Sequence, residues 1–384
     1  TTTGMYNNPD RLEDHHRDTV FLPQWFQAHG YRTWGVGKIL HGEPLHAGDP
    51  TRPIFEQFTK KQVIFPPEKL HGPTTGPGKN PIFDWGEMEG RLGDDRTIDL
   101  AIDRIKNARE TNAPPVFQAV GIFSPHLPHF ARPEHFARYP SENLMLPPMP
   151  EDDFDDIPAA GRAMADFQKL WNQHLLDARD AGDPAPLARL VQSYQAAATY
   201  GDEMLDRLLD ALDSTGRADN TVIVLWSDHG YHLGDKDSVV KFTLWEMACR
   251  VPLVIVAPGV TQPGTRIDTP VNLVDLYPTL VELAGLPKKP GLDGESLLPL
   301  LKNPKATRDT PAITTFLQGN HAVVTKDWRY IHYADGSEEL YRSEDVWNHE
   351  NLADDPEFAP DIATLRKHVP ADETQSAQTI KSPR

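Results

Sequence analysis

Apolar residues along the first three quarters of the chain follow two alternating patterns. Short segments that predict strands occur at residues 31–36 and 115–123, and continuous apolar runs, which predict strands buried on both faces, occur at residues 221–226 and 252–257. Apolar residues at helical spacing, which predict amphipathic helices, occur at residues 20–29, 97–110, 186–212 and 273–284. This alternation predicts an α/β fold with a large, mostly parallel sheet flanked by helices.

The rhythm changes near residue 308. Short strands separated by turn signals are expected at residues 312–317, 321–325, 328–333 and 339–341. They predict a small antiparallel sheet, followed by a last helix near residues 361–368 and a polar tail, 372–384, that we expect to fray. We therefore divide the chain into a large domain over residues 1–307 and a small C-terminal antiparallel-sheet subdomain over residues 308–384.

Two long stretches show no regular periodicity. Residues 43–92 are rich in proline and glycine, and residues 130–185 also read mainly as loops. The whole chain has 36 prolines in 384 residues, which favours long, rigid, irregular connections. We expect these two stretches to form the walls of a substrate site.

The charge balance excludes two broad classes of partner. The chain has 38 Lys and Arg against 56 Asp and Glu, a formal net charge of −18. Without a basic run, so acidic a chain is a poor general binder of nucleic acid or of anionic membranes.

No apolar run approaches the roughly 20 residues of a membrane span, and a lone cysteine, Cys249, excludes an internal disulfide. These features leave the oligomeric state open.

Candidate chemistry follows the predicted strands. Residues 227–230 (Ser-Asp-His-Gly) come directly after the strand at 221–226, and open α/β sheets bind ligands at the carboxyl ends of their strands. There Asp228 and His229 can offer a carboxylate oxygen and an imidazole to a divalent cation. The alternative is an aspartate that caps the next turn beside a histidine in solvent.

Three further segments carry basic side chains. Lys38 and His41 follow the first predicted strand, and their spacing would place two cationic donors on one side of a helical turn, as a tetrahedral oxyanion needs. His126 follows the second strand between two prolines that fix the backbone around it. Lys241 comes a short loop after the Asp-His pair. Taken alone, each of these residues is more simply explained as a loop or surface side chain without a function.

The combined pattern is more informative than its parts. Because strand ends meet at one edge of a parallel sheet, the topology would assemble one carboxylate, three histidines and two lysines into a single pocket. Such a pocket suits a divalent metal and a bound sulfate or phosphate group. A nucleophile is missing, since the chain has no Gly-x-Ser-x-Gly elbow and no P-loop, and Cys249 leads into an apolar strand.

These segments, in this order, resemble the type I sulfatases of the alkaline-phosphatase-like superfamily, most closely the iduronate-2-sulfatase-like branch. The resemblance extends over nearly the whole chain and implies that family's fold, with the catalytic domain at residues 1–307. It is carried by residues 36–41 (Val-Gly-Lys-Ile-Leu-His), 125–128 (Pro-His-Leu-Pro), 227–234, 241–242 with 250–253, 274–280, 292–297, 329–331 and 339–341.

The resemblance implies a role for each candidate residue. Asp228 and His229 would bind Ca²⁺, while Lys38 and Lys241 would hold sulfate oxygens. His41 and His126 would serve the sulfate, one near the hydroxyl of the nucleophile and one near the leaving oxygen. In this branch the nucleophile is a formylglycine made from Cys or Ser in a Cys-x-Pro-x-Arg motif; its hydrate attacks sulfur, and a base then helps to expel sulfate.

The chain departs from the branch in two places. The formylglycine motif and a first pair of metal-binding aspartates lie upstream of the segment that residues 1–6 resemble, so we expect the modification upstream of Thr1 and no turnover by residues 1–384 alone. Ser124 stands where the branch usually has a lysine, which would remove one cationic contact to the substrate. His129 in place of a common phenylalanine is a smaller change near the same site.

The leading interpretation is therefore a calcium-dependent sulfuric ester hydrolase that acts on a sulfated sugar or polysaccharide, exported to the periplasm or the exterior as the resemblance implies. One alternative is a non-catalytic relic that only binds sulfated glycans. Another is a phosphate or phosphonate ester hydrolase of the same superfamily. A single Asp-His pair with two lysines argues for one metal plus basic side chains, as in sulfatases.

Overall fold

Three parallel strands form the sheet that carries the first candidate residues. The computed structural model describes residues 5–6, 19–41, 53–107, 113–167 and 169–371. In it, β1 (Arg32–Gly37) lies between β2 (Gln57–Lys60) and β4 (Val116–Gly121). Gly37 pairs with both Lys60 and Gly121, so the three strands end at the same level. The strands expected at 31–36 and 115–123 are confirmed, whereas β2 lies in the stretch 43–92 that we expected to be a loop.

A second pair of strands differs from the expectation in orientation. β6 (Ile223–Trp226) and β7 (Leu253–Val256) pair with each other antiparallel, although both apolar runs were expected to belong to a parallel sheet. Trp226, Val254 and Val256 are 45–50% exposed, so these apolar runs are not buried on both faces. A third, short parallel pair consists of β3 (Trp85–Glu87) and β5 (His129–Ala131).

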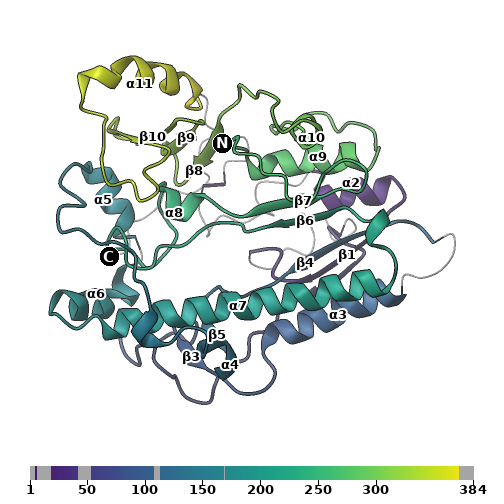
Figure 1. Cartoon of the computed structure of the whole chain (residues 1–384), viewed down its shortest axis with the longest axis horizontal. Coiled ribbons are helices and arrows are strands. Elements are labelled where there is room, and N and C mark those ends of the chain that lie inside the picture. Colours follow the sequence, from purple (N-terminus) through teal and green to yellow (C-terminus); the bar gives the residue numbers. More distant parts are fainter. Residues whose placement is uncertain (1–4, 7–18, 42–52, 108–112, 168, 372–384) are drawn as a thin grey trace.

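Long helices cover the parallel strands (Figure 1). The expected helix at 97–110 is α3 (Gly93–Asn107), whose last expected residues lie outside the described ones. The helix expected at 186–212 is α7 (Ala185–Ser214), which packs along α3 through Ile98, Tyr200 and Met204. The helices expected at 20–29 and 273–284 are α2 (Leu22–Ala28) and α9 (Leu276–Leu283). The α/β fold class is confirmed.

The stretch 130–185 is more ordered than we expected. It contains α4 (Pro133–Phe136), α5 (Ala159–Ala165) and α6 (Gln173–Asp180). Later in the chain, α8 (Glu246–Cys249) and α10 (Leu298–Lys302) are also short helices. The 3-10 turns are Pro77–Lys79, Ser141–Asn143, Lys169–Trp171, Ala218–Asn220, Leu273–Asp275, Pro356–Phe358 and Arg366–His368. α6 adds Leu175 and Leu176 to the core under α7, because these two leucines are the apolar face of a short helix.

The C-terminal sheet matches the sequence-based expectation. β8 (Ala312–Thr315), β9 (His321–Val324), β10 (Trp328–His332) and β11 (Glu338–Arg342) form an antiparallel sheet in sequential order. α11 (Ala359–Leu365) covers it, and the tail 372–384 lies outside the described residues. On its other face the sheet shares a core with α5 and Trp245, where buried Glu339 accepts hydrogen bonds from Trp245, Tyr333 and Tyr341.

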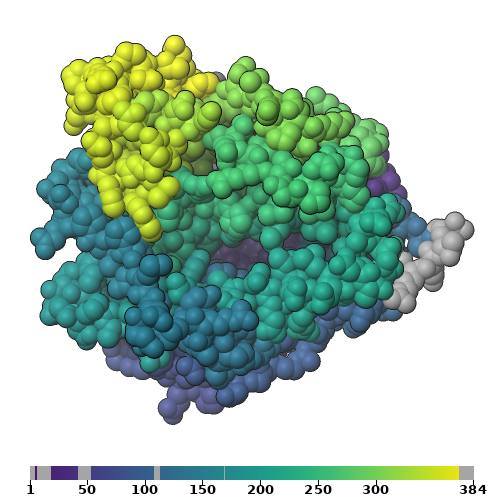
Figure 2. Space-filling view, in the orientation of Figure 1, coloured from purple at the N-terminus to yellow at the C-terminus, as the bar shows by residue number. Residues whose placement is uncertain are grey.

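A large cavity separates the parallel strands from the β6–β7 pair. Its volume is about 2040 Å³, and Figure 2 shows the molecular face hollowed between the β6–β7 segment and α7. Apolar side chains from the two strand pairs and the helices line most of it, among them Val120, Val224, Leu208 and Leu276. Within the described residues, no helix combines the length and the apolarity that crossing a membrane would require.

Candidate functional site

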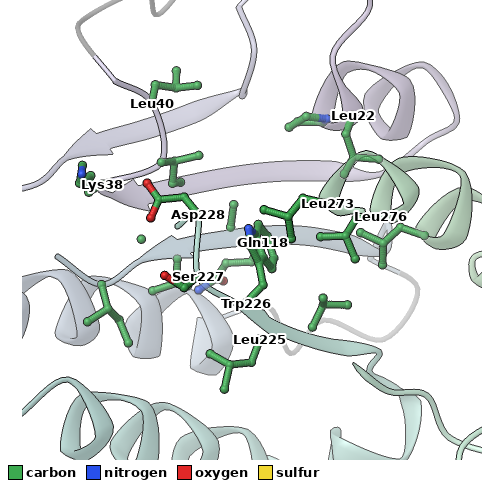
Figure 3. Close-up of a pocket in the computed structure, with 18 of the residues that line it drawn as sticks. Leu22, Lys38, Leu40, Gln118, Leu225, Trp226, Ser227, Asp228, Leu273 and Leu276 are labelled. Carbon is green, nitrogen blue, oxygen red and sulfur yellow. The ribbon is translucent and has the colours of Figure 1, made fainter. Parts of the chain in front are cut away.

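The six residues singled out in the sequence all line this one cavity. They come from the loops after β1, β4 and β6 and from the segment that leads to β7, and are Lys38, His41, His126, Asp228, His229 and Lys241. Figure 3 shows the carboxylate of Asp228 directed toward the end of the cavity where Lys38 lies, with Leu273 and Leu276 at the opposite end. The cavity therefore has a charged end formed by the site residues, and its remaining walls are mostly apolar.

Lys38 owes its position to two glycines. Gly37 has φ +86°, and a Cβ on it would lie 2.1 Å from the carbonyl oxygen of Gly121, so only glycine allows β1 and β4 to approach this closely. The Lys38 amide donates to the same Gly121 oxygen at 2.8 Å. Burial lowers the pKa of the Lys38 ammonium, and attraction to Asp228 partly offsets this shift.

His126 stands on a loop that a buried carboxylate holds. Asp94, at the start of α3, accepts hydrogen bonds from the amides of Phe123 (2.8 Å) and Ser124 (2.9 Å). His126 Nδ1 lies 2.5 Å from the Leu127 carbonyl oxygen; because a carbonyl only accepts, Nδ1 carries the proton and Nε2 keeps a lone pair. Burial, followed by repulsion from Lys38, lowers the pKa of His126 to about 2, so the free protein holds a neutral imidazole.

Asp228 and His229 have the geometry of two ligands to one cation. His229 Nδ1 donates to the Gly230 carbonyl oxygen at 2.8 Å, so the lone pair of the ring lies on Nε2. This orientation by a backbone carbonyl is typical of metal-binding histidines. Asp228 Oδ1 lies 3.6 Å from that nitrogen, and the Asp228 side chain is 70% exposed. The donor set therefore fits a divalent metal.

The two residues make only part of a calcium site. Calcium takes six to eight oxygen ligands. Within the described residues, no group of three or more His, Cys, Asp or Glu side chains is placed to hold a metal. Further ligands to a calcium ion here would have to be backbone, amide or hydroxyl oxygens, water, substrate or residues outside the described ones.

Lys241 contacts His229 from a loop that buried hydrogen bonds hold in place. Its ammonium donates to His229 Nε2 at 2.5 Å. Within the loop, fully buried His232 contacts Asp235 through Nδ1 and lies 2.6 Å from the Thr243 hydroxyl through Nε2. Burial, followed by repulsion from Lys38, lowers the pKa of Lys241 to about 8. The same two causes lower the pKa of His41.

The structure adds residues that the sequence reasoning missed. Lys61, the residue after β2, places its ammonium 4.2 Å from the ring centre of Phe123. Asp94 lies before the helix expected at residues 97–110 and was not singled out, although it positions the His126 loop. An acidic residue at a helix start is common, and Lys61 lies in an aperiodic stretch, so neither position carried a distinguishing signal.

The two departures from the branch lie in different surroundings. Ser124 lines the cavity beside His126. His129 is fully buried in β5, where its ring meets Tyr194 and Tyr231 edge-on, and burial lowers its pKa to about 3. His129 therefore packs in the core and takes no place in the charged end of the cavity.

Two family models match the chain. The model described as "Sulfatase" matches residues 1–286. The model described as "N-sulphoglucosamine sulphohydrolase, C-terminal" matches residues 234–375. Between them they span the loops that carry all six site residues and the C-terminal sheet.

Several named proteins are similar in sequence to most of the chain. A protein named "Sulfatase" from Formosa agariphila is 33% identical over 385 residues, covering 96% of this chain and 74% of the relative. "Iduronate 2-sulfatase" of Homo sapiens is 30% identical over 328 residues, covering 75% of this chain. The chain spans only 58% of the length of that human protein and of its Mus musculus counterpart.

Solved structures share the fold at lower identity. A protein in complex with its substrate D-glucosamine-2-N,6-O-disulfate superposes with a TM-score of 0.69 at 21% identity, covering 96% of this chain and 83% of that chain. A phosphonate monoester hydrolase from Silicibacter pomeroyi superposes with a TM-score of 0.73, also at 21% identity, covering 95% and 83%. At these identities the two structures establish the architecture alone.

Proposed function

Because the chain belongs to the sulfatase family, we propose that the protein to which it contributes hydrolyses sulfate esters of sugars. The observation that carries this proposal is the gathering of Lys38, His41, His126, Asp228, His229 and Lys241 at one end of a single cavity. Cationic side chains beside a carboxylate–imidazole pair suit an ester whose leaving and non-bridging oxygens are both negatively charged in the transition state.

In this proposal, Lys38 and Lys241 bind the non-bridging oxygens of the sulfate. Both ammonium groups are partly desolvated, which strengthens their attraction to an anion relative to a lysine in water. Both are positioned before the substrate arrives, Lys38 by the β1–β4 contact and Lys241 by a loop that buried His232 holds through Asp235 and Thr243. They therefore stabilise developing charge without having to reorganise during the reaction.

His126 and His41 handle protons in the proposed reaction. Nε2 of His126 is the nitrogen left free by the Leu127 contact, so it is the atom that accepts or returns a proton at the leaving oxygen. A bound sulfate would offset the positive field of Lys38 and Lys241, which now disfavours the imidazolium of His126. Substrate binding therefore raises the basicity of His126 in the complex. His41, which is exposed, serves the nucleophile side.

Two groups expected from the resemblance complete the proposal. A Ca²⁺ ion held in part by Asp228 and His229 would supply a Lewis acid for the sulfate oxygens. A formylglycine upstream of Thr1 would supply the nucleophilic hydroxyl. Sulfated carbohydrate as the substrate is supported by relatives named for such substrates, among them iduronate 2-sulfatase and an ulvan-active sulfatase. The resemblance also leads us to propose export to the periplasm or the exterior.

The test uses the complete enzyme, assayed with an aryl sulfate and with a sugar sulfate in the presence of calcium. We expect turnover of both, and we expect Lys38→Ala and Lys241→Ala each to lower kcat by about 10²–10³, as loss of one preorganised donor does elsewhere. A phosphonate monoester serves as the comparison substrate. Binding of sulfated glycans without any turnover, or preference for the phosphonate, would contradict the proposal in favour of a binding protein or of the other hydrolase class.

A further inference from the structure

Lys61 stands at the end of the same sheet as the proposed catalytic residues. The parallel register pairs Gly37 of β1 with Lys60 of β2, so Lys38 and Lys61 are the first residues after two neighbouring strand ends. β4 lies on the other side of β1 and ends at the same level. The backbone of Lys61 therefore lies at the same end of the sheet as Lys38 and the His126 loop.

The Lys61 side chain extends across that edge toward the His126 loop. Strands two places apart in a sheet lie about 10 Å from each other. The Lys61 ammonium nevertheless lies 4.2 Å from the ring centre of Phe123, which follows β4. The Phe123 ring centre is 4.7 Å from that of His126, and the Lys38 ammonium lies 5.7 Å from the same Phe123 ring. Two ammonium groups and the imidazole thus surround one aromatic ring.

Lys61 has no ion-pair partner in the part of the chain that the structure describes. Within the described residues its ammonium makes no hydrogen bond and no ion pair, and its closest defined contact is the Phe123 ring. Its positive charge repels the protonated forms of His41, His126 and Lys241 and so helps to lower their pKa values. An ammonium that lies against an aromatic ring and near other cations attracts an anionic group of a ligand.

The position of Lys61 differs from that of the two lysines proposed to hold the sulfate. Asp228 acts on the pKa values of Lys38 and Lys241, whereas Asp94 is the carboxylate that acts on Lys61. Lys61 follows the outer strand β2 and lies beside the Phe123 ring, whereas Lys38 follows the central strand β1 and lines the cavity with Asp228. A substrate whose reacting sulfate lies at the metal end would present another part of the sugar to Lys61.

We propose that Lys61 is a specificity-determining residue that binds a second anionic group, a carboxylate or a further sulfate, on the sugar beside the reacting sulfate. The inference rests on the proposed function and narrows its substrate class to sugars with two negative charges. Lys61 forms a charge-assisted hydrogen bond with the second group, while Lys38 and Lys241 hold the first. A sugar with a single sulfate would leave Lys61 without a partner.

The test compares Lys61→Met with the parent in the complete enzyme. The substrates are a neutral sugar monosulfate, a sulfated uronate and a disulfated sugar. We expect kcat/KM to fall by about ten- to a hundredfold, mainly through KM, for the sulfated uronate, the disulfated sugar or both, which matches the loss of one hydrogen bond to a charged group. The neutral monosulfate should change less than about threefold by the same reasoning. The two dianionic substrates distinguish a carboxylate partner from a second sulfate.

Two further variants separate contact from general charge. Lys326→Met removes one positive charge from the exposed C-terminal subdomain and should leave all three substrates unaffected. Ser124→Lys, added to Lys61→Met, places an ammonium on the adjacent cavity wall and should restore part of the lost KM effect. Equal losses on all three substrates, or no loss on either dianionic one, would overturn the proposal.

Calorimetric binding of the disulfated sugar to the same variants gives a readout that does not need turnover. If the parent binds the sugar more tightly than Lys61→Met but hydrolyses no sulfate, the proposed function fails and the role of Lys61 stands. If turnover is present and binding is identical in the two proteins, the role of Lys61 fails and the proposed function stands.

Discussion

The ammonium of Lys241 donates a hydrogen bond to Nε2 of His229 at a distance of 2.5 Å. The lysine proposed to hold sulfate and the histidine proposed to bind metal therefore share one lone pair. Asp228 lies beside both, 3.6 Å from the same nitrogen. The proposed metal site and the proposed sulfate site are thus electrostatically coupled.

This relationship predicts that Lys241→Met tightens calcium binding. The variant removes a positive charge next to a metal ligand and frees its lone pair, and relief of a repulsion of about 1.4 kcal/mol corresponds to about tenfold in Kd. Isothermal calorimetry with calcium on the complete enzyme measures the change, with Lys79→Met as an exposed control of equal charge. Unchanged or weaker binding by Lys241→Met would show that the two sites are independent.

The pKa of His126 predicts an acid-sensitive contribution to stability. Burial lowers this pKa from 6.5 to about 2. Between about pH 2 and pH 6.5, His126 is therefore protonated in the unfolded chain but not in the folded one. The contribution is therefore complete above pH 6.5 and is lost as the pH falls below it. Urea unfolding at several pH values should show a shallower decline for His126→Gln than for the parent. An NMR titration that shows imidazolium forming near pH 6 in the folded free protein would refute the prediction.

The proposed role of His126 predicts that its effect depends on the leaving group. An aryl oxide leaves without a proton, whereas a sugar alkoxide needs one. We expect His126→Ala to lower kcat by about 10²–10⁴ for a sugar sulfate, the range of general acid–base catalysis, and clearly less for an aryl sulfate. Steady-state kinetics with both substrates provide the comparison. Equal losses on the two would remove His126 from the acid role.

Asp94 is predicted to position His126 without touching the substrate. Its carboxylate accepts two backbone hydrogen bonds, and Asp94→Asn leaves only one accepting oxygen. The stability loss should be about 1–3 kcal/mol, the cost of an unsatisfied buried group, with a lower kcat from a displaced loop. Asp103→Asn on the exposed face of α3 is the control. A stability loss with kcat unchanged would limit Asp94 to a structural role.

Much of the fold follows from local patterns in the sequence. α7 and the four C-terminal strands could be predicted because each has an unbroken periodicity and distinct turn residues at its ends. The antiparallel pairing of β6 and β7 could not, because an apolar run encodes burial but not the direction of a partner that lies 27 or more residues away. β2 was missed because it has four residues, two of them exposed, between proline-rich segments.

The candidate site was predictable to the extent that its residues follow strands. Lys38, His126 and Asp228 each follow a predicted strand, so their convergence at strand ends could be expected, although β6 lies in a separate antiparallel pair and not in the sheet of β1 and β4. Lys61 could not be recognised in the same way, because the strand that precedes it is visible only through its pairing with β1. The pKa of His126 also depends on burial and on lysines from three other segments, which no local pattern contains.

The division of the cavity into a charged end and an apolar remainder has a calorimetric consequence. A ligand confined to the charged end displaces water from ionic groups, so its affinity should weaken with added salt while its binding enthalpy varies little with temperature. Any segment or molecule that also covers the apolar walls around Leu208 and Leu276 removes hydrocarbon surface from water. Its binding enthalpy should then become steadily more negative on warming, since burial of apolar surface carries a negative heat-capacity change. A salt series combined with a temperature series therefore reports which end of the cavity a ligand occupies.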